Sequence, residues 1–454
     1  MLGRAENLPH RATEPPQFDL SDIQGNVLRG YTLPACAYVF VRILDIAKAC
    51  RLLERTLPMV MTAETWDSPP ERAMNVAVGY SALVKLGLDP EILASFPPVF
   101  REGMKARAEH LGDRGPSAPE HWDIPDFDFM VTVYARDLSV LETALAEVIA
   151  TDVEGGVDPV YIQLALDRPT AEDHFGNFDG VSQPALGGSG VVGRPGDGQP
   201  DGNGGWRDVA VGEVLLGYHD EDGDLPAAPA QPFDRNGTFV VVRKLHTHVA
   251  AYREFLASAN YPGGPEQLAA KILGRWPDGT PLALSPDHPD PSLVRDPAKV
   301  NNFNYEGDPL GLACPVGSHI RRANPRDSKG FFEGRLTNRH RMVRRGRAYG
   351  PPLEPGATED DGVDRGLMFV CFQADIWRQF ETVQALWIDD GNPFGLGPDK
   401  DPLVGEHHGS KGKLTIPGHP PFFVKPLPRL VTMRGGDYLF QPSISALRYM
   451  ASLH

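Results

Sequence analysis

The sequence has few cysteines and none of the short motifs that mark the common phosphate-loop, dinucleotide, zinc-protease and serine-hydrolase sites. Its four cysteines, Cys36, Cys50, Cys314 and Cys371, form no C-x-x-C pair. This argues against a disulfide framework and against a thiolate zinc site. There is no G-x-x-x-x-G-K-[ST] loop, no G-x-G-x-x-G between a strand and a helix, no H-E-x-x-H and no G-x-S-x-G, so the enzyme classes built on those motifs are not indicated.

The sequence also lacks long apolar runs and an excess of positive charge. No apolar run reaches about 18 residues, so no membrane span is predicted. Residues 1–17 lack both the apolar core and the twin arginine of an export signal; we expect a disordered tail and a cytoplasmic protein. Lys+Arg number 44 against 60 Asp+Glu, a net charge of −16, which disfavours nucleic acid and anionic membranes as partners.

What is present is an ordinary globular composition with many loops. The 454 residues are 41% hydrophobic and 23% charged, which fits two or three packed domains rather than disorder. Gly 48 and Pro 44 follow no collagen-like period. We therefore expect long irregular loops between packed elements, and such loops often carry function.

Hydrophobic patterning predicts two parts with a similar order of elements, which suggests two copies of one architecture. In the first part, apolar β-rich runs predict strands and 3.6-residue spacing predicts helices. The strands are expected at 35–44, 75–80, 128–135 and 160–166, and the helices at 46–55, 81–88 and 138–150. After a glycine-rich stretch at 187–206, further strands are expected at 237–245, 366–373, 429–434 and 438–441, with helices at 247–257 and 376–386.

The element order predicts the fold class. Strand, helix, strand, strand, helix, strand is the split βαβ, or ferredoxin-like, unit. The sequence therefore predicts an α+β protein with two ferredoxin-like domains, at residues 18–206 and 207–454. The glycine-rich stretch between them has the composition of a linker.

The first segment with chemical potential is Gly176-Asn177-Phe178-Asp179-Gly180, followed by Val181-Ser182-Gln183-Pro184. An aspartate between an aromatic residue and a glycine suits a tight turn in which the side chain caps backbone amides. The same turn can present the Asp179 carboxylate over a cavity. Both interpretations are open from the residues alone.

The second segment is 314–326, CPVGSHIRRANPR. His319 could be an ordinary surface or core histidine, or a metal ligand. The neighbouring arginines raise the local positive potential and are expected to keep the imidazole neutral, as a ligand must be.

The third segment, 339–350 (RHRMVRRGRAYG), completes a basic island. Nine arginines and one lysine lie between His319 and Arg347, against Asp327 and Glu333. A nucleic-acid patch or a solvated charged face would explain the island. A buried anionic cofactor explains it more economically, because arginine forks match carboxylates and phosphates. The His407-His408 pair lies in a polar loop and is expected at the surface.

Together these segments resemble the dye-decolorising (DyP-type) haem peroxidases, in their longer bacterial and fungal-like members. The family's GxxDG turn is matched by Gly176, Asp179 and Gly180, its proximal segment by Ser318–Arg321 and Asn324–Arg326, and its distal arginine segment by Arg344-Arg345-Gly346. Residues 22–28 and 434–443 also look like the family's opening and closing segments. The resemblance implies antiparallel sheets in both domains, with haem held mainly by the C-terminal domain.

The resemblance also implies roles for individual residues. His319 becomes the axial ligand of the iron of haem b, and Asp179 and Arg344 become the catalytic pair on the opposite face. The remaining cofactor-binding positions are Gly180, Val181, Ser182, Asn324, Pro325 and Arg326, with Arg326 as a candidate for a haem propionate. Asp375 is a candidate to orient His319. Surface oxidation through Trp377 or Tyr349 is conceivable, although core packing is the commoner role for such aromatics.

The implied activity is the reduction of hydrogen peroxide to water through a ferryl intermediate, with one-electron oxidation of small aromatic, phenolic or dye donors. An oxygenase-like or hydrolytic activity on the same cofactor is a second reading. A haem-binding or haem-handling protein with little peroxidase turnover is the alternative from a different class. Asp179 and Arg344 favour the peroxidase, because a carrier needs neither. We expect a monomer or a homodimer.

Overall fold

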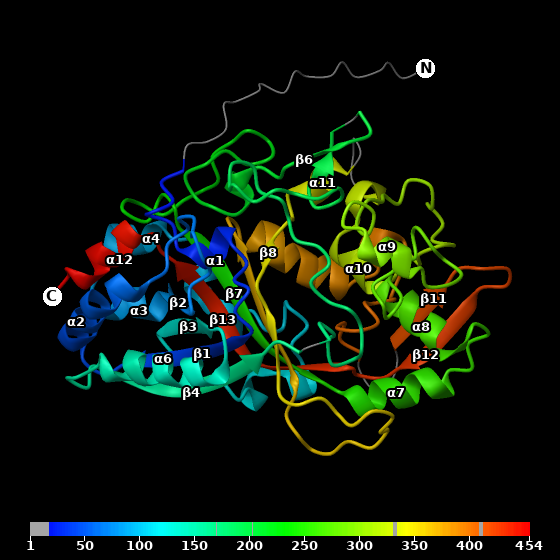
Figure 1. The fold of residues 1–454 in the computed structure, drawn as a ribbon, viewed down its shortest axis with the longest axis horizontal. Coiled ribbons are helices and arrows are strands. Elements are labelled where there is room, and N and C mark those ends of the chain that lie inside the picture. The colour runs from blue at the N-terminus through cyan, green and yellow to red at the C-terminus, as the bar shows by residue number, and fades with distance from the viewer. Residues whose placement is uncertain (1–17, 169, 202, 330–333, 408–411) are drawn as a thin grey trace.

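The computed structural model describes residues 18–454 except 169, 202, 330–333 and 408–411 (Figure 1). The predicted tail, residues 1–17, and His408 lie outside the described residues. None of the helices in the described part of the chain combines the length and the apolar character that crossing a membrane requires.

The first half of the chain forms a four-stranded antiparallel sheet with the strand order β4-β1-β3-β2. Asp45 and Asp137 begin its two crossover helices, because each side chain accepts a hydrogen bond from a backbone amide of the first turn. The elements are β1 (Ala35–Ile43), α2 (Ile46–Thr56), β2 (Arg72–Val78), β3 (Phe129–Ala135), α6 (Leu138–Ala150) and β4 (Val157–Leu166). This confirms the predicted ferredoxin-like order.

The second half repeats that order as β13-β7-β10-β8, with β9 also paired to β10. Its elements are β7 (Thr238–Thr247), α7 (Val249–Ser258), β8 (Val343–Arg344), β9 (Arg347–Tyr349), β10 (Gly366–Gln373), the π-helical segment η6 (Trp377–Ile388) and β13 (Val431–Gln441). The two predicted closing strands are one strand, β13, with a bulge between Met433 and Gly436. Only glycine fits at position 436, because a Cβ there would lie 1.9 Å from the Val242 carbonyl oxygen.

The two sheets join edge to edge, where Val78 of β2 pairs with Phe440 of β13. One face of the joined sheet packs against helices, including α12 (Ile444–Ala451). The other face encloses a second core that takes Tyr38, Val240 and Phe372 from both sheets. The far edges also approach each other, since β4 lies beside β9. The division of domains at residue 206 stays a prediction.

The long connection between α7 and β10 is folded against the second sheet, on the right-hand side of Figure 1. It contains α8 (Gly264–Leu273), α9 (Pro291–Arg295), α10 (His319–Ala323), α11 (Arg335–Asn338) and the strand β8. The remaining elements are α1 (Gly25–Leu28), α3 (Tyr80–Lys85), α4 (Pro90–Ser95), α5 (Pro98–Ala106), β5 (Gln199–Pro200), β6 (Trp206–Arg207), β11 (Gly412–Ile416) and β12 (Phe422–Leu427).

Candidate functional site

His319 is the first residue of the short helix α10, which packs against α8 and η6. The helix ends before Asn324-Pro325, because proline disfavours helical backbone in the residue that precedes it. The imidazole Nδ1 lies 2.9 Å from Oδ2 of Asp401. Its Nε2 has no hydrogen-bond partner among the described residues, and the side chain is 28% exposed. A histidine that ligates a metal typically has one ring nitrogen hydrogen-bonded to a carboxylate and uses the other nitrogen for the metal. His319 has this arrangement.

Asp401 is fully buried and rigidly held. Its Oδ1 accepts hydrogen bonds from the backbone amides of Leu403 at 2.9 Å and Val404 at 3.0 Å, which leaves Oδ2 for His319. Burial raises the pKa of Asp401, but the charge and hydrogen bond of His319 more than offset this, and the pKa lies below its ordinary value. The carboxylate is therefore ionised and suited to accept the Nδ1 proton.

The expectation that Asp375 orients His319 is wrong. Asp375 instead accepts a hydrogen bond from the backbone amide of Arg378 at 2.9 Å and so caps the start of its own helix. Asp401 could not be found from the sequence, because it lies 82 residues after His319 in a loop with several other aspartates.

The electrostatic environment of His319 also differs from the expectation, which considered only the neighbouring arginines. Burial lowers the pKa of His319, but the charge and the hydrogen bond of Asp401 outweigh burial, and the pKa lies above its ordinary value of 6.5. The adjacent arginines have other partners. Arg321 binds Asp308, and Arg322 donates to the carbonyl oxygens of Trp387 and Asp399.

Most of the basic island is structural rather than directed at a ligand. Its buried guanidinium groups replace water as donors to loop carbonyls, which satisfies backbone groups that the long loops leave unpaired. Arg341 donates to Asp197 and Gly198, Arg345 to Asn26, and Arg326 to Asn301 and Phe303. The interpretation of the whole island as a surface for an anionic cofactor is therefore too broad. The role of Arg326 at a propionate stays a prediction.

Asp179 lies in a tight turn that follows β4 and is pinned to the second half of the chain. The amide of Phe178 donates to the carbonyl of Pro277 at 2.8 Å. Asp173 holds the base of the turn by accepting the amide of Asn177 at 2.9 Å. One oxygen of Asp179 accepts the amide of Gly180 at 2.6 Å, and the side chain is exposed. The capping interpretation is therefore confirmed, and presentation of the exposed carboxylate over a cavity stays a prediction.

Arg344 faces the same region from β8. Successive side chains of a strand point to opposite sides, so Arg344 turns toward the Asp179 loop while Arg345 turns to Asn26. The Arg344 guanidinium donates to the carbonyl of Ser182 at 2.6 Å. Burial lowers the pKa of Arg344, and the charge of Asp179 opposes that effect. The charge of Arg344 also acts on His319, so Arg344 lies within electrostatic reach of both Asp179 and His319.

Asn301 is a site residue that sequence reasoning missed. It is 1% exposed, and its amide group uses both its donors and its acceptor. The Nδ2 donates to Ser182 at 3.0 Å and to Asp197 at 2.8 Å, while Oδ1 accepts from Arg326 at 2.5 Å. Asn301 thus connects the loop after Asp179 with the segment after His319, and no local motif signals it.

The glycine-rich stretch that was expected to be a linker packs against Asn301 at Gly196 and Asp197. Gly196 has φ +85°, and a Cβ there would lie 1.6 Å from the carbonyl oxygen of Asn301. Asp197, the next residue, accepts the Asn301 amide. Glycine is therefore required where this stretch crosses the chain beside Asn301.

Other candidates divide between surface and interior. His407 was expected at the surface but is 4% exposed, and its Nε2 lies 2.9 Å from the carbonyl oxygen of Asp401. Trp377 is 56% exposed, with its ring stacked on His110 and near the Arg107 guanidinium. Tyr349 is buried and donates to Asp364.

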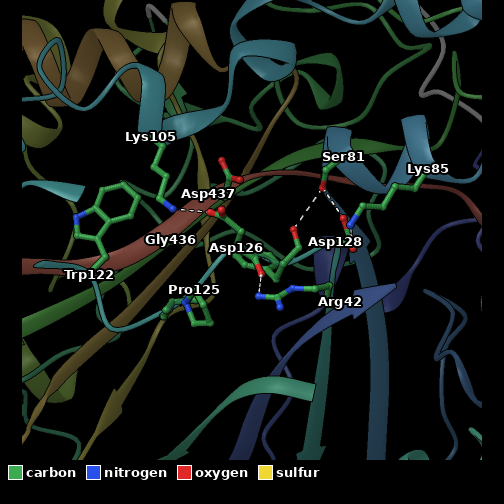
Figure 2. A pocket seen from close by; sticks show the side chains of 12 residues that line it. Arg42, Ser81, Lys85, Lys105, Trp122, Pro125, Asp126, Asp128, Gly436 and Asp437 are labelled. Carbon is green, nitrogen blue, oxygen red and sulfur yellow. Dashed lines mark hydrogen bonds and ion pairs between the residues drawn. The ribbon is translucent and has the colours of Figure 1, made fainter. Parts of the chain in front are cut away.

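A separate pocket of about 250 Å³ lies at the seam of the two sheets (Figure 2). Its lining includes none of the predicted site residues. Its charged groups largely pair with each other, because Lys85 binds Asp128 at 2.6 Å and Lys105 binds Asp126. The chemistry of the candidate site is elsewhere, around Asp179, Arg344 and His319.

Comparison with known proteins gives one consistent result. Residues 221–393 match the family described as Dyp-type peroxidase, C-terminal. The chain is 31% identical to the dye-decolorizing peroxidase of Mycena epipterygia, over 96% of this chain and 87% of that protein. It is 28% identical to a multifunctional dye peroxidase of an Amycolatopsis strain, over 94% and 95%.

Solved structures show the same likeness. An ancestral D-type dye decolorizing peroxidase superposes with a TM-score of 0.82 at 29% identity, covering 96% of this chain and 99% of that one. A dye-decolorizing peroxidase in complex with 2,6-dimethoxyphenol superposes with a TM-score of 0.81 at 26% identity, covering 96% and 100%. These structures confirm the α+β fold class.

Proposed function

Since the chain belongs to the dye-decolorizing peroxidase family and is accordingly a peroxidase, we propose that it holds haem b on His319 and reduces hydrogen peroxide to water with Asp179 and Arg344. The observation that carries the proposal is the His319 imidazole. Its Nδ1 is fixed by buried Asp401, and its Nε2 is partly exposed and has no hydrogen-bond partner among the described residues. The Nε2 that Asp401 leaves without a partner fits a haem iron, which would bind the neutral form of the imidazole, while the porphyrin supplies the nitrogen ligands around the iron.

Haem, when bound, supplies the redox chemistry of the reaction. The protein moves the proton and stabilises charge. Asp179 takes the proton from one peroxide oxygen as a general base and returns it to the other oxygen as a general acid. Arg344 cannot carry this proton because its guanidinium stays charged. It instead stabilises the negative charge that develops as the O–O bond breaks. Two electrons from two donor molecules complete the reduction.

We propose small phenolic and other aromatic compounds as donors. The relative solved with 2,6-dimethoxyphenol supports this class. We also propose a cytoplasmic location, which the four buried free thiols support, because reduced cysteines are usual in a reducing compartment. The alternative of a monomer or a homodimer can be decided by light scattering of the purified protein.

The test of the proposed function is an absorption spectrum of the haem-supplied protein, recorded before and after one equivalent of peroxide. His319→Ala should alter the ferric spectrum and weaken haem retention. Asp179→Asn should keep the haem but slow the reaction with peroxide by roughly 10²–10⁴-fold, the usual contribution of general acid–base catalysis. Asp201→Asn is the matched control, because Asp201 caps an exposed turn in the same way.

Three results would count against the proposal. A protein that stays colourless after haem supply would rule out haem as its cofactor. An unaltered spectrum in His319→Ala would remove this residue as the ligand. A haem protein that does not react with peroxide would instead be a carrier.

A further inference from the structure

The strand β8 carries Arg344 and, within the described part of the chain, has a neighbouring strand on one edge only. β8 pairs with β10 through Arg344 opposite Cys371, and the amide of Arg345 donates to the carbonyl of Val370 at 2.8 Å. In an antiparallel ladder, alternate backbone amides point away from the partner strand. The amide of Arg344 therefore points to the outer edge, where the sheet offers it no acceptor.

A side chain from the Asp179 loop fills this gap. The Oε1 of Gln183 accepts the Arg344 amide at 3.0 Å, across 161 residues of sequence. The preceding residue of the loop, Ser182, accepts the Arg344 guanidinium through its carbonyl. The main chain and the side chain of Arg344 are thus both tied to the loop that presents Asp179.

We propose that Gln183 is a positioning residue that acts as the missing strand neighbour of β8 and sets the placement of Arg344 relative to Asp179. This rests on the proposed function, in which Asp179 and Arg344 act on the same peroxide. Gln183 touches neither peroxide nor cofactor in this role. It acts through the backbone of Arg344, so its loss is expected to change the reaction with peroxide and not the later reactions with donors.

Two substitutions separate the hydrogen bond from the volume of the side chain. Gln183→Met keeps a similar length but removes the acceptor, whereas Gln183→Glu keeps an acceptor oxygen. Gln163→Met is the control for the same chemical change on the strand β4, where Gln163 contacts Tyr161 and the Leu164 carbonyl.

The first measurement is amide hydrogen exchange at Arg344. Exchange is expected to be at least roughly tenfold faster in Gln183→Met than in the parent protein, and close to the parent in Gln183→Glu, because an edge amide without an acceptor is open to solvent. Equal protection of Arg344 in all variants would overturn the proposal. This readout does not depend on haem or on turnover.

The second measurement is the stopped-flow rate constant for peroxide in the haem-loaded protein. We expect roughly a tenfold decrease in Gln183→Met, since small misplacement of a catalytic group is costly. The kcat/KM for a phenolic donor and the behaviour of Gln163→Met should be unchanged. Recovery of the peroxide rate in Gln183→Glu supports the acceptor role, and an equal loss in both Gln183 variants contradicts it. A parent protein that does not react with peroxide would refute the proposed function. The exchange measurement would still show whether Gln183 protects the Arg344 amide.

Discussion

The contact between Asp401 and His319 makes a demanding prediction about Asp401→Asn. Oδ1 of Asp401 accepts two backbone amides, so the asparagine carbonyl oxygen must occupy that position. The new NH₂ group then faces Nδ1 of His319, now 2.9 Å from Oδ2. Nδ1 must become an acceptor, and the single proton of the neutral imidazole moves to Nε2. That is the nitrogen that we propose binds the iron.

The size of the effect follows from the alternatives open to the side chain. Turning the amide over would place its NH₂ against two backbone donors and lose about 1–3 kcal/mol for each unsatisfied group. Keeping the amide in its first orientation disfavours the His319 tautomer whose Nε2 carries no proton, which is the tautomer that can bind a metal. Losing a carboxylate that orients a metal-ligating histidine typically costs about 10–100-fold in affinity, or roughly 1.4–2.7 kcal/mol. We expect a weakening of haem binding within that range.

The assay is titration of the haem-free protein with haem, followed in the Soret region. Asp375→Asn is the matched control, since Asp375 caps a helix and does not contact His319. It should bind haem as tightly as the parent protein. If Asp401→Asn bound haem within twofold of the parent and gave the same ferric spectrum, the assignment of Asp401 as the partner of the axial ligand would be refuted.

Three further outcomes are expected. Asn301→Asp places a carboxylate oxygen against Asp197, whose Oδ1 now lies 2.8 Å from Nδ2 of Asn301. It should lower the free energy of unfolding by about 1–3 kcal/mol. Asn302→Asp at an exposed position is the control, and equal urea midpoints for the two variants would contradict the role of Asn301. Burial lowers the pKa of His174 from its ordinary 6.5 to about 4, so the unfolded chain binds a proton that the fold excludes, and stability should fall as the pH decreases from 6.5 toward 4. His174→Gln should reduce this slope in urea titrations and exposed His121→Gln should not. Trp377→Phe should slow oxidation of a bulky dye but not of a small phenol, because the indole is exposed; equal loss on both donors would argue for a packing role.

Elements with strong local signals could be predicted from the sequence. The strand β1 is a continuous apolar run, the helix α6 follows a 3.6-residue period, and the predicted bounds of α6 coincide with Leu138–Ala150. The short strand β8 could not be predicted in this way, because its two residues form a strand only through pairing with β10. The bulge in β13 had a visible cause in Gly435-Gly436, but glycines also end strands, and the sequence favoured two strands there.

The candidate site shows the same division. Asp179, His319 and Arg344 lie in compact motifs, from which their roles were predicted. Asp401 and Asn301 were missed, because each acts through contacts that only the folded chain creates. The arginines were misjudged for a physical reason. The sequence reveals the charge of Arg322, but it does not reveal that the guanidinium donates its hydrogen bonds to backbone carbonyls.

The contacts made by the segment around α1 have a consequence for biogenesis. Asn26 receives the Nε2 of Gln441 through a side-chain bond that spans 415 residues, and its carbonyl accepts Arg345. During translation this segment cannot form its contact with Gln441 until β13 has left the ribosome. Contacts this distant in sequence form slowly and leave partly folded chains exposed to aggregation. The segment around α1, which holds Arg345, therefore reaches its final form only after β13 has been synthesised, and we expect the yield of folded protein in recombinant expression to depend on chaperone capacity.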